Sequence, residues 1–509
     1  MYGRSLTFSH LQIHVLEQDA FEVLRLLRFW RNRLAPISRI PPEVLTLIPD
    51  FWDTRHRDQG VIALTHVCRA WREIFTSCPS LWSDFDCEDV DKTQIYLDRS
   101  KSSPIDLRLK RVESLSPHDP FFQVVPHAVT RLKSLSIHGT PENLQDIATL
   151  LSHPVSILET LAIEVDLECT PQDGLVVETM LFDGDLSSLR ELQLKCVHTV
   201  LPWRNMVNLT SFTLGYTLLG NFPIRHLLNF FESAPRLRKI QLHSATPTFG
   251  AQNGRLVSLA HLERMEILGG GPSSLLLDHL LIPVGAKLTT RVGLDLLGPA
   301  PGGSMFDGHL PRSLSNLRNF SDFTEIHLHI GGFYPRIRFS GPNGQVTMIS
   351  ATPRDTTVTT YRVYESLARF DTSKIERLRI NAGDLWDNRG NCSFFRALYP
   401  MRALRTLTIS RCKNISTSID ILHDDCLCPK LEELILDPRV HGEKFDIQAV
   451  VGTLASRTSW GLKLKSVKIV SADKSVQTCA LKLEEYVPHV ECSPRVAAVC
   501  DGDSSDEED

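Results

Sequence analysis

Residues 404–409, LRTLTI, and residues 431–436, LEELIL, decide the fold prediction, because each places apolar side chains at its first, fourth and sixth positions. The same six-residue core returns elsewhere in the chain, mostly at intervals of 20 to 33 residues. The other cores are LKSLSI from Leu132, LETLAI from Leu158, LRELQL from Leu189, LTSFTL from Leu209, LRKIQL from Leu237, LERMEI from Leu262, FTEIHL from Phe323, IERLRI from Ile375 and LKSVKI from Leu464. A recurring period of this length indicates stacked supersecondary units and not one compact core.

The spacing and period of these cores are typical of leucine-rich repeats, in which each core is a short strand with its aliphatic side chains turned inward. A single repeat cannot bury its own apolar face, so neighbours must stack, and each fully buried large aliphatic side chain contributes roughly 1.5 to 3 kcal/mol. Return segments such as 143–154 and 224–235 have helical spacing and stop at a proline. The predicted fold class is α/β: a leucine-rich-repeat solenoid over residues 87–485, with a parallel sheet inside and helices outside.

Two stretches break the period, near 298–308 and near 331–360, and both are predicted to project from the solenoid. The second reads as a β-hairpin around Pro342-Asn343-Gly344. KLTTRVGLDL from Lys287 and GQVTMIS from Gly344 have strand-like composition, so we expect degenerate repeats within the two long gaps.

Ahead of the repeats the pattern is helical. Residues 11–34 carry apolar side chains at helical spacing without Gly or Pro, which predicts one amphipathic helix in an N-terminal segment 1–35. A short helix is expected to begin at Pro42 and to be stopped by Pro49. One longer helix is expected to carry the apolar stripe from Val61 to Ile74, and the residues after Pro79 are expected to be extended.

The C-terminal residues 486–509 lose the periodicity and are predicted to be a disordered acidic tail. The last nine residues, DGDSSDEED, hold six acids and no base, and the formal charge of the chain is −5, which leaves +1 for the rest. A nearly neutral folded part argues against a nucleic-acid partner.

Composition also bears on the cellular compartment. The first dozen residues lack the apolar stretch of a signal peptide, and no later stretch is long and apolar enough to predict a membrane span. The 12 cysteines are scattered over 509 residues without a Cys-x-x-Cys pair. Free thiols in a reducing compartment, cytoplasmic or nuclear, are therefore expected.

Residues that could carry chemistry give little support for an enzyme. The signatures GxxxxGK[ST], GxSxG and HExxH do not occur, so we predict neither catalytic residues nor a cofactor. His423, Cys426 and Cys428 are the best candidate metal ligands, but His-x2-Cys-x-Cys is not a standard zinc spacing. Cys412 lies eight residues after Leu404, where the leucine-rich pattern places an Asn or Cys to hold the turn after the strand. No metal site is predicted.

Residues 38–52, SRIPPEVLTLIPDFW, and 60–86, GVIALTHVCRAWREIFTSCPSLWSDFD, resemble the F-box-like module at the start of many fungal F-box and leucine-rich-repeat proteins. The matching features are Pro41-Pro42-Glu43 with the hydrophobic helix after it, Val67-Cys68-x-x-Trp71, and Pro79-Ser80-Leu81-Trp82. The resemblance implies a three-helix F-box-like domain at 36–86 that binds a Skp-family adaptor and, through it, a cullin-RING ubiquitin ligase of the SCF type. The residues that it implies for this surface are Ile40, Pro41, Pro42, Val44, Leu45, Ile48, Leu64, Val67, Cys68, Trp71 and Ile74.

The resemblance further implies that the repeats present a protein substrate to the ligase. Polar positions between the inward aliphatics are expected to line the concave face of the sheet, where a partner would be recognised. Their mixed charges favour a protein epitope over nucleic acid. These residues are Lys239, Gln241, Arg264, Glu266, Glu325, His327, Arg377, Arg379, Glu433 and Lys468.

Two interpretations of the N-terminal module stay open at this point. The apolar stripe that includes Leu64 and Trp71 either binds the adaptor or packs against the helix at 11–34 as a private core. In the second case the chain is a leucine-rich-repeat scaffold, and the module is only its structural cap, which solenoids need.

Overall fold

The structure is a computed structural model, and its description is confined to segments between residue 10 and residue 493. The described residues are 10–52, 57–87, 90–112, 128–140, 154–165, 175–177, 182, 186–199, 206–216, 224–244, 255–269, 273–292, 306, 308–330, 334–350, 356–368, 370–381, 394–412, 415–437, 446–470 and 482–493. The predicted helix at 143–154, except its last residue, and most of the predicted insertion at 298–308 lie outside them.

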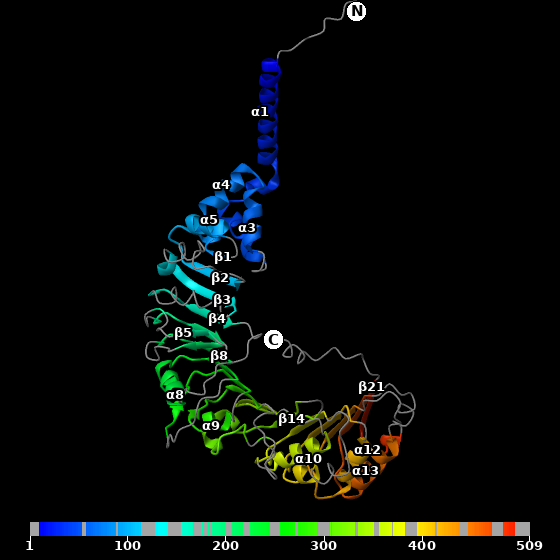
Figure 1. Ribbon diagram of the computed structural model, residues 1–509. Coiled ribbons are helices and arrows are strands. Elements are labelled where there is room, and N and C mark those ends of the chain that lie inside the picture. Colours follow the sequence, from blue (N-terminus) through cyan, green and yellow to red (C-terminus); the bar gives the residue numbers. More distant parts are fainter. Residues whose placement is uncertain are drawn as a thin grey trace, which may run out of the picture. The chain divides into compact units, whose positions relative to one another are not determined.

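Within these residues the chain is a mixed α/β protein (Figure 1). The α-helices are α1 (His10–Leu34), α2 (Pro42–Leu45), α3 (Arg57–Thr65), α4 (Arg69–Ser77), α5 (Val90–Ser100), α8 (Ile224–Ser233), α9 (Ser273–Leu277), α10 (Thr356–Leu367), α12 (Ile415–Asp420) and α13 (Ile447–Ser459). Short 3-10 helices are η1 (Pro36–Arg39), η2 (Ile48–Phe51), η3 (Pro79–Trp82), η4 (Val129–Arg131), η10 (Leu314–Asn316), η11 (Arg318–Phe320) and η12 (Ile421–His423).

Most strands belong to one large sheet of 17 strands, which is mostly parallel. Its strands are β1 (Asp84–Asp86), β2 (Ile105–Val112), β3 (Leu132–Gly139), β4 (Thr160–Val165), β6 (Glu191–Lys195), β8 (Ser211–Gly215), β9 (Lys239–His243), β11 (Arg264–Leu268), β13 (Lys287–Val292), β14 (Glu325–His329), β15 (Arg336–Gly341), β16 (Gly344–Ser350), β17 (Arg377–Asn381), β18 (Thr406–Ser410), β19 (Glu433–Asp437), β20 (Ser466–Val470) and β21 (His489–Ser493). Two small parallel pairs stand apart, β5 (Leu175–Val177) with β7 (Val197–Thr199) and β10 (Val257–Ser258) with β12 (Leu280–Leu281).

The chain divides into two compact units. Unit 1 contains Met1–Ala162 and Leu181–Asp185, and unit 2 contains Ile163–Met180 and Leu186–Asp509. Unit 1 begins with α1, which confirms the helix predicted at 11–34, and none of the residues of α1 is buried.

The three-helix count predicted for residues 36–86 is wrong. The helical part of this segment of unit 1 is divided into more and shorter pieces, some of them α-helices and some 3-10 helices. They are η1, α2, η2, α3, α4 and η3, and β1 follows them. The stripe predicted as one helix from Val61 to Ile74 breaks after Thr65, where Cys68 is extended with φ −159° and ψ 171°. The break is stabilised by Arg72, whose Nε donates to the carbonyl oxygen of Thr65 at 3.0 Å. Pro49 does not end the preceding helical stretch but lies in the first turn of η2.

Trp82 is the centre of the aromatic core of unit 1. Its side chain is 0% exposed, and its Nε1 donates to the carbonyl oxygen of Phe75 at 2.8 Å. The ring of Tyr96 lies 5.0 Å from it, and the guanidinium of Arg99 lies 4.2 Å from its centroid. Residues 79–82, predicted to be extended, instead form η3, because this tight turn brings Trp82 back under α4.

Unit 2 confirms the strand prediction for its repeat cores. Its core strands pair in parallel in two runs, first β6, β8, β9, β11 and β13, and then β14, β17, β18, β19 and β20. The core of β18 shows why, since Leu404, Leu407 and Ile409 are all fully buried while Thr406 and Thr408 between them are partly exposed. One face of the sheet is therefore apolar and the other polar.

The hairpin predicted within 331–360 is present, but the prediction that it projects is wrong. β15 and β16 pair antiparallel, β16 also pairs in parallel with β13, and β15 pairs with β14, so the hairpin fills the sheet between two repeat strands. Phe339 anchors it, with ring centroids at 5.3 Å from Phe320 and 4.9 Å from Phe370. The turn requires glycine at Gly344, where φ is +139° and an added Cβ would lie 2.7 Å from the carbonyl oxygen of Ala286.

The predicted disorder of residues 486–509 is also partly wrong. His489–Ser493 form β21, which pairs in parallel with β20 along its whole length. The remaining residues of that range, from 494 onward, lie outside the described part.

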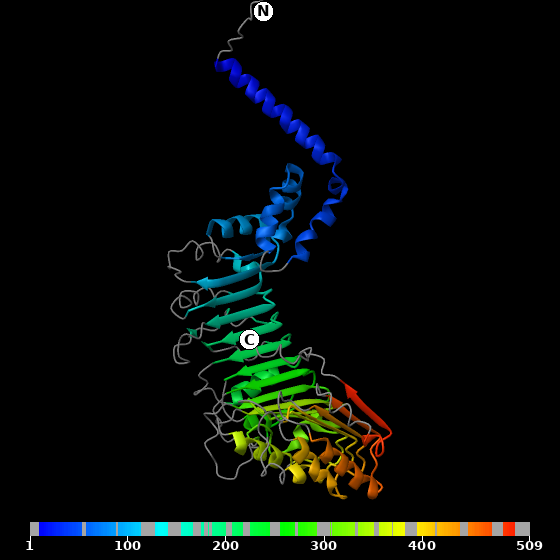
Figure 2. The ribbon, with the colours of Figure 1, turned by 90° about the vertical axis from the view of Figure 1, so that its right-hand side faces the viewer.

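Helices cover one face of the unit 2 sheet, as α10, α12 and α13 show in Figures 1 and 2. α8 confirms the helix predicted within 224–235, and it buries five apolar side chains, with Phe230 lying 4.5 Å from Phe212 of β8. Asp446 caps the N-terminus of α13, and its carboxylate accepts from the amide of Gln448 at 2.9 Å. The polar face opposite these helices is called the open face below.

His309 makes the stability of unit 2 depend on pH. It is 1% exposed, its Nδ1 lies 2.8 Å from Oγ1 of Thr290, and burial lowers its pKa to about 3. Since the unfolded imidazole titrates near its ordinary value, the unfolded chain binds the extra proton first as the pH falls. The stability that unit 2 gains from its neutral His309 is therefore complete above about pH 6.5 and is lost as the pH falls from about 6.5 to about 3. By pH 5 the loss in free energy of unfolding is roughly 2 kcal/mol.

Urea unfolding at pH 7.5 and pH 5 measures this effect. Between pH 7.5 and pH 5 the free energy of unfolding should fall much less in His309→Gln than in wild type. In His261→Gln, a change at an exposed position, it should fall as much as in wild type. Equal pH dependence in wild type and His309→Gln would contradict the assignment.

Candidate functional site

Three residues predicted to bind an adaptor lie in the core of unit 1. Leu45, Leu64 and Trp71 are buried, and the ring of Trp71 packs 5.7 Å from that of Phe75. α1 is not what covers them, because it buries none of its own side chains. Leu64 and Trp71 are thus neither exposed nor packed against the helix at 11–34, the two arrangements that the sequence left open. Their side chains are buried within the segment that follows α1.

The other predicted adaptor residues reach solvent. Pro41, Pro42, Val44 and Val67 are exposed, with Val44 at 51% and Val67 at 57%. The partly exposed members of the predicted set are Ile40, Ile48, Cys68 and Ile74.

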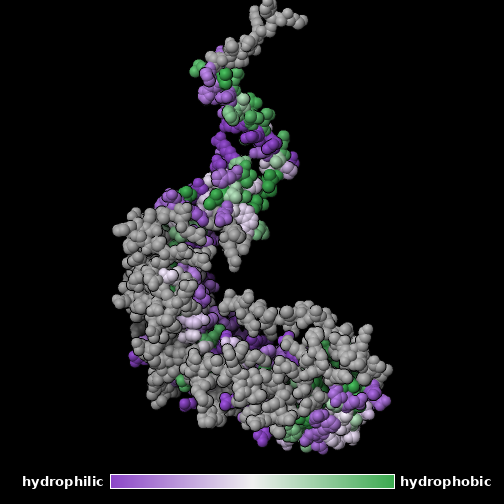
Figure 3. Space-filling model, turned by 45° about the vertical axis from the view of Figure 1, so that its right-hand side comes forward, coloured by the Kyte–Doolittle hydropathy of each residue, from purple (hydrophilic) through white to green (hydrophobic). Residues whose placement is uncertain are grey.

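Sequence reasoning missed three exposed apolar side chains in the same segment: Ile37 of η1, Leu47, and Phe51 of η2. Phe51 is 86% exposed, an unusual position for an aromatic side chain in a monomeric protein. Its signal in the sequence is the Phe-Trp pair before the polar connection at 53–59. Figure 3 shows hydrophobic side chains gathered over α1 and the short helices after it. The apolar surface is defined here as Ile37, Val44, Leu47, Phe51 and Val67.

The second candidate site is the open face of unit 2, where the strand register brings the predicted recognition residues together. Lys239 lies beside Arg264 and Gln241 beside Glu266 across β9 and β11. Farther along the sheet, Glu325 lies beside Arg377 and His327 beside Arg379 across β14 and β17. The prediction that these side chains share one face is confirmed by the register.

Hydrogen bonds and ion pairs tie many of these side chains to one another. Gln241 Nε2 donates to Glu266 Oε2 at 2.7 Å, and Arg264 Nη2 lies 2.5 Å from Glu266 Oε1. Glu266 is buried, so this carboxylate is held by its neighbours and not by solvent.

Glu325 holds two arginines less tightly. Arg377 Nη2 lies 3.5 Å and Arg379 Nε 3.4 Å from its carboxylate, and both arginine side chains are more than half exposed. Because two cations share one anion, this part of the open face keeps cationic donors directed toward solvent.

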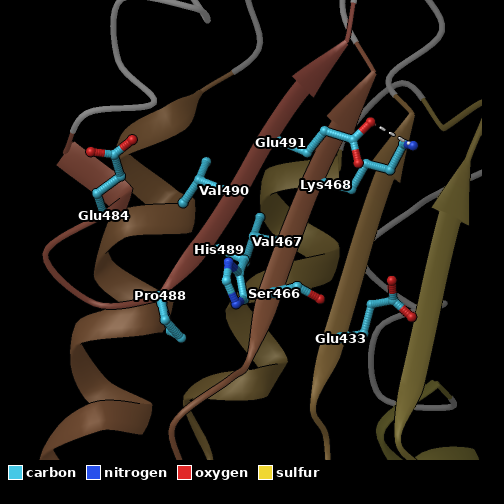
Figure 4. A pocket seen from close by; sticks show the side chains of 9 residues that line it. All are labelled: Glu433, Ser466, Val467, Lys468, Glu484, Pro488, His489, Val490 and Glu491. Atoms are coloured by element: carbon cyan, nitrogen blue, oxygen red, sulfur yellow. Dashed lines mark ion pairs between the residues drawn. The ribbon is translucent and has the colours of Figure 1, made fainter.

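The remaining predicted recognition residues, Glu433 and Lys468, line a pocket of ≈ 390 Å³ at the last strands of the sheet (Figure 4). Lys468 Nζ lies 2.8 Å from Glu491 Oε1 of β21. Sequence reasoning missed Glu491 and His489, because β21 falls in the range predicted to be disordered. The lining residues are Glu433, Ser466, Val467, Lys468, Glu484, Pro488, His489, Val490 and Glu491.

The cysteine cluster near residue 426 has a structural account. Cys412 is buried after β18, with its Sγ 3.9 Å from Ser418 Oγ, as the leucine-rich pattern predicts for a turn-holding residue. Burial raises the pKa of the Cys428 thiol to about 12. Asp424, Asp425 and Cys426 have ligand atoms close enough together for one ion, but they are adjacent in sequence and largely exposed. His423 instead faces Ser456, with Nδ1 and Oγ 2.9 Å apart.

Comparison with known proteins adds no family: neither a family model nor a curated protein matches this sequence. Of the helices that the structure describes, none combines the length and apolar character needed to cross a bilayer.

Proposed function

We propose that this chain is a substrate-receptor subunit of an SCF-type cullin-RING ubiquitin ligase. In this proposal residues 36–86 are an F-box-like module whose apolar surface binds a Skp-family adaptor. The parallel repeat strands are a leucine-rich-repeat solenoid whose open face binds a protein substrate. The chain itself performs no catalysis, because ubiquitin transfer belongs to other subunits, and its role is to hold the substrate near them.

The observation that carries the proposal is the apolar surface, above all the exposure of Phe51. Five large apolar side chains within 31 residues, from Ile37 to Val67, lie open to solvent beside a well-packed core. Exposing apolar area costs free energy, about 25 cal/mol per Å², so such a group of side chains is typical of a protein interface. Aromatic side chains, Phe included, are also enriched at the cores of protein interfaces.

The open face supports the second half of the proposal. Its side chains are polar and of both signs, and several are held in place by neighbours, as Glu266 and Glu325 show. A preorganised polar surface of this kind suits recognition of a folded or extended protein segment by complementary charge.

Adaptor binding by the apolar surface is tested with Phe51→Asp and Val44→Asp. Both residues are exposed, so we expect the folded chain to keep its circular dichroism spectrum while affinity for the adaptor falls at least tenfold. Binding is measured by pull-down and titration with purified Skp-family adaptor from the source organism. The matched control is Ile95→Asp, which places the same charge at an exposed apolar position of α5.

A wild-type chain that is folded and does not bind the adaptor would contradict the proposal, and so would equal losses in Phe51→Asp and Ile95→Asp. Leu64 and Trp71 are unsuitable for this test, because they are buried and their replacement disturbs folding and surface together.

A second candidate function, a repeat scaffold with a structural cap, is favoured by one observation. β1, at the end of the F-box-like segment, pairs in parallel with β2 through Asp84–Asp106, Phe85–Leu107 and Asp86–Arg108. A module that adds a strand to the sheet of the repeats is suited to capping the end of that sheet. The scaffold is the better reading if the adaptor does not bind.

A further inference from the structure

α1 has a feature that the proposed function does not use: its apolar residues follow a heptad pattern. Positions 13, 16, 20, 23, 27, 30 and 34 are separated alternately by three and four residues and are all apolar. They are Ile13, Leu16, Ala20, Val23, Leu27, Trp30 and Leu34. Three consecutive heptads with apolar residues at both core positions are the pattern of a helix that packs along another helix.

The structure leaves this seam open. No residue of α1 is buried, and the six large side chains of the seam are between 43% and 74% exposed. An isolated helix of 25 residues gains little from propensity alone, so an apolar stripe along its whole length calls for a partner surface of matching length.

The distribution of charged residues along α1 indicates which partner helix fits it. The first half of α1 carries Glu17, Asp19 and Glu22 without Lys or Arg, and the second half carries Arg25, Arg28, Arg31 and Arg33 without an acid. A second copy of the same helix in antiparallel orientation therefore sets each acidic half against a basic half.

The side chains also fit in one antiparallel alignment, in which the helices cross at residue 25. The core layers are then Leu16 with Leu34, Ala20 with Trp30, and Val23 with Leu27, so the smallest core residue faces the largest. The flanking positions pair Glu17 with Arg31 and Asp19 with Arg33 of the other copy. In a parallel pair Trp30 would face Trp30, Ala20 would face Ala20, and no flanking position would join opposite charges.

We propose that two copies of this chain associate through an antiparallel helix pair formed by residues 13–34 of α1. The interface is two-fold symmetric, as in most homodimers, and each of its charge pairs therefore occurs twice. An assembly of this kind carries two apolar surfaces and two open faces, so it binds a repeated or dimeric partner with avidity.

Sedimentation velocity and light scattering on the full chain test the association. We expect a mass of twice 57.3 kDa that returns to 57.3 kDa on dilution. Val23→Asp, in the central layer, should raise the dissociation constant at least tenfold while circular dichroism stays unchanged. Phe21→Asp should leave it unchanged, because Phe21 is exposed on the opposite side of the helix.

Orientation is tested by charge exchange. Glu17→Arg and Arg31→Glu should each weaken the dimer several-fold, because each places like charges together, and the double variant should restore it. Single variants that dimerise as tightly as wild type would overturn the antiparallel arrangement. A chain that stays monomeric at all concentrations would overturn the proposed dimer. If α1 of that monomer bound vesicles of anionic lipid, its apolar seam would belong to a membrane surface and the dimer would still be overturned. Adaptor binding is measured separately on Val23→Asp, so failure of one proposal does not decide the other.

Discussion

Replacing Trp82 with alanine is expected to lower the free energy of unfolding of unit 1 by about 3–5 kcal/mol. The side chain is fully buried, and its removal leaves a large cavity against Tyr96 and takes the indole donor from the carbonyl oxygen of Phe75. Trp82→Phe should lose less, since it keeps most of the ring contact and loses only the hydrogen bond and part of the volume.

Urea unfolding followed by near-ultraviolet circular dichroism measures this loss. Trp460→Ala is the matched control, because Trp460 is 43% exposed and its removal should change the stability by less than about 0.5 kcal/mol. If Trp82→Ala were as stable as the control, the aromatic cluster around Trp82 would not be the core of unit 1.

The same physics separates the two kinds of apolar residue that the sequence presents together in residues 36–86. Leu64 and Trp71 belong to the core, whereas Val44 and Val67 are exposed, yet all four satisfy the helical spacing. Spacing identifies apolar stripes but not which stripe is covered, because coverage depends on contacts between segments distant in sequence. The resemblance to F-box-like modules therefore predicted a surface whose members the structure divides between core and solvent.

The repeat strands could be predicted with their inward side chains because the information is local. In LRTLTI the buried Leu404, Leu407 and Ile409 and the polar residues between them follow directly from the alternation of a strand. The pairing of one core with the next follows from the period, since neighbours must stack.

Features that depend on long-range pairing could not be predicted. Arg336–Gly341 and Gly344–Ser350 have strand composition, but only their pairing with β14 and β13 places them inside the sheet. β21 lacks the leucine pattern and is added to the sheet by pairing with β20. The break between α3 and α4 cannot be seen in the spacing either, because Leu64 and Trp71 are seven residues apart, as on one continuous helix. It depends on the extended backbone of Cys68 and on the hydrogen bond from Arg72 to Thr65.

Cys428 has a structural role that its place in the candidate metal motif does not reveal. It lies in a left-handed turn with φ 46°, a strained conformation for a residue other than glycine, and hydrogen bonds from an arginine stabilise that turn. Arg457 of α13 donates from Nη2 to the carbonyl oxygen of Cys428 at 2.9 Å and from Nη1 to that of Leu427 at 3.1 Å. The carbonyl oxygen of Leu422 lies 3.5 Å from Nη1.

Arg457→Ala is therefore expected to destabilise unit 2 by about 3 kcal/mol or more, the second of the two largest effects. Arg457 is 1% exposed, and burial lowers its pKa, because the charged guanidinium loses its hydration there. The carbonyl oxygens that it binds are the acceptors that replace water. Removing the guanidinium takes the arginine donor from these carbonyl oxygens, of which that of Cys428 keeps the amide of Leu431 at 3.0 Å, and opens a cavity against η12.

Arg457→Met separates the two contributions, because methionine refills much of the volume but donates no hydrogen bond. We expect it to recover part of the loss and to stay at least 1 kcal/mol below wild type in urea unfolding. Ser459→Ala, at an exposed position near the end of α13, should be close to neutral. Wild-type stability in Arg457→Met would mean that the cost of burying the charge equals what its hydrogen bonds contribute, as is known for some buried ion pairs. The turn at Cys428 would then be held by packing and by the hydrogen bond from the Leu431 amide to the Cys428 carbonyl oxygen.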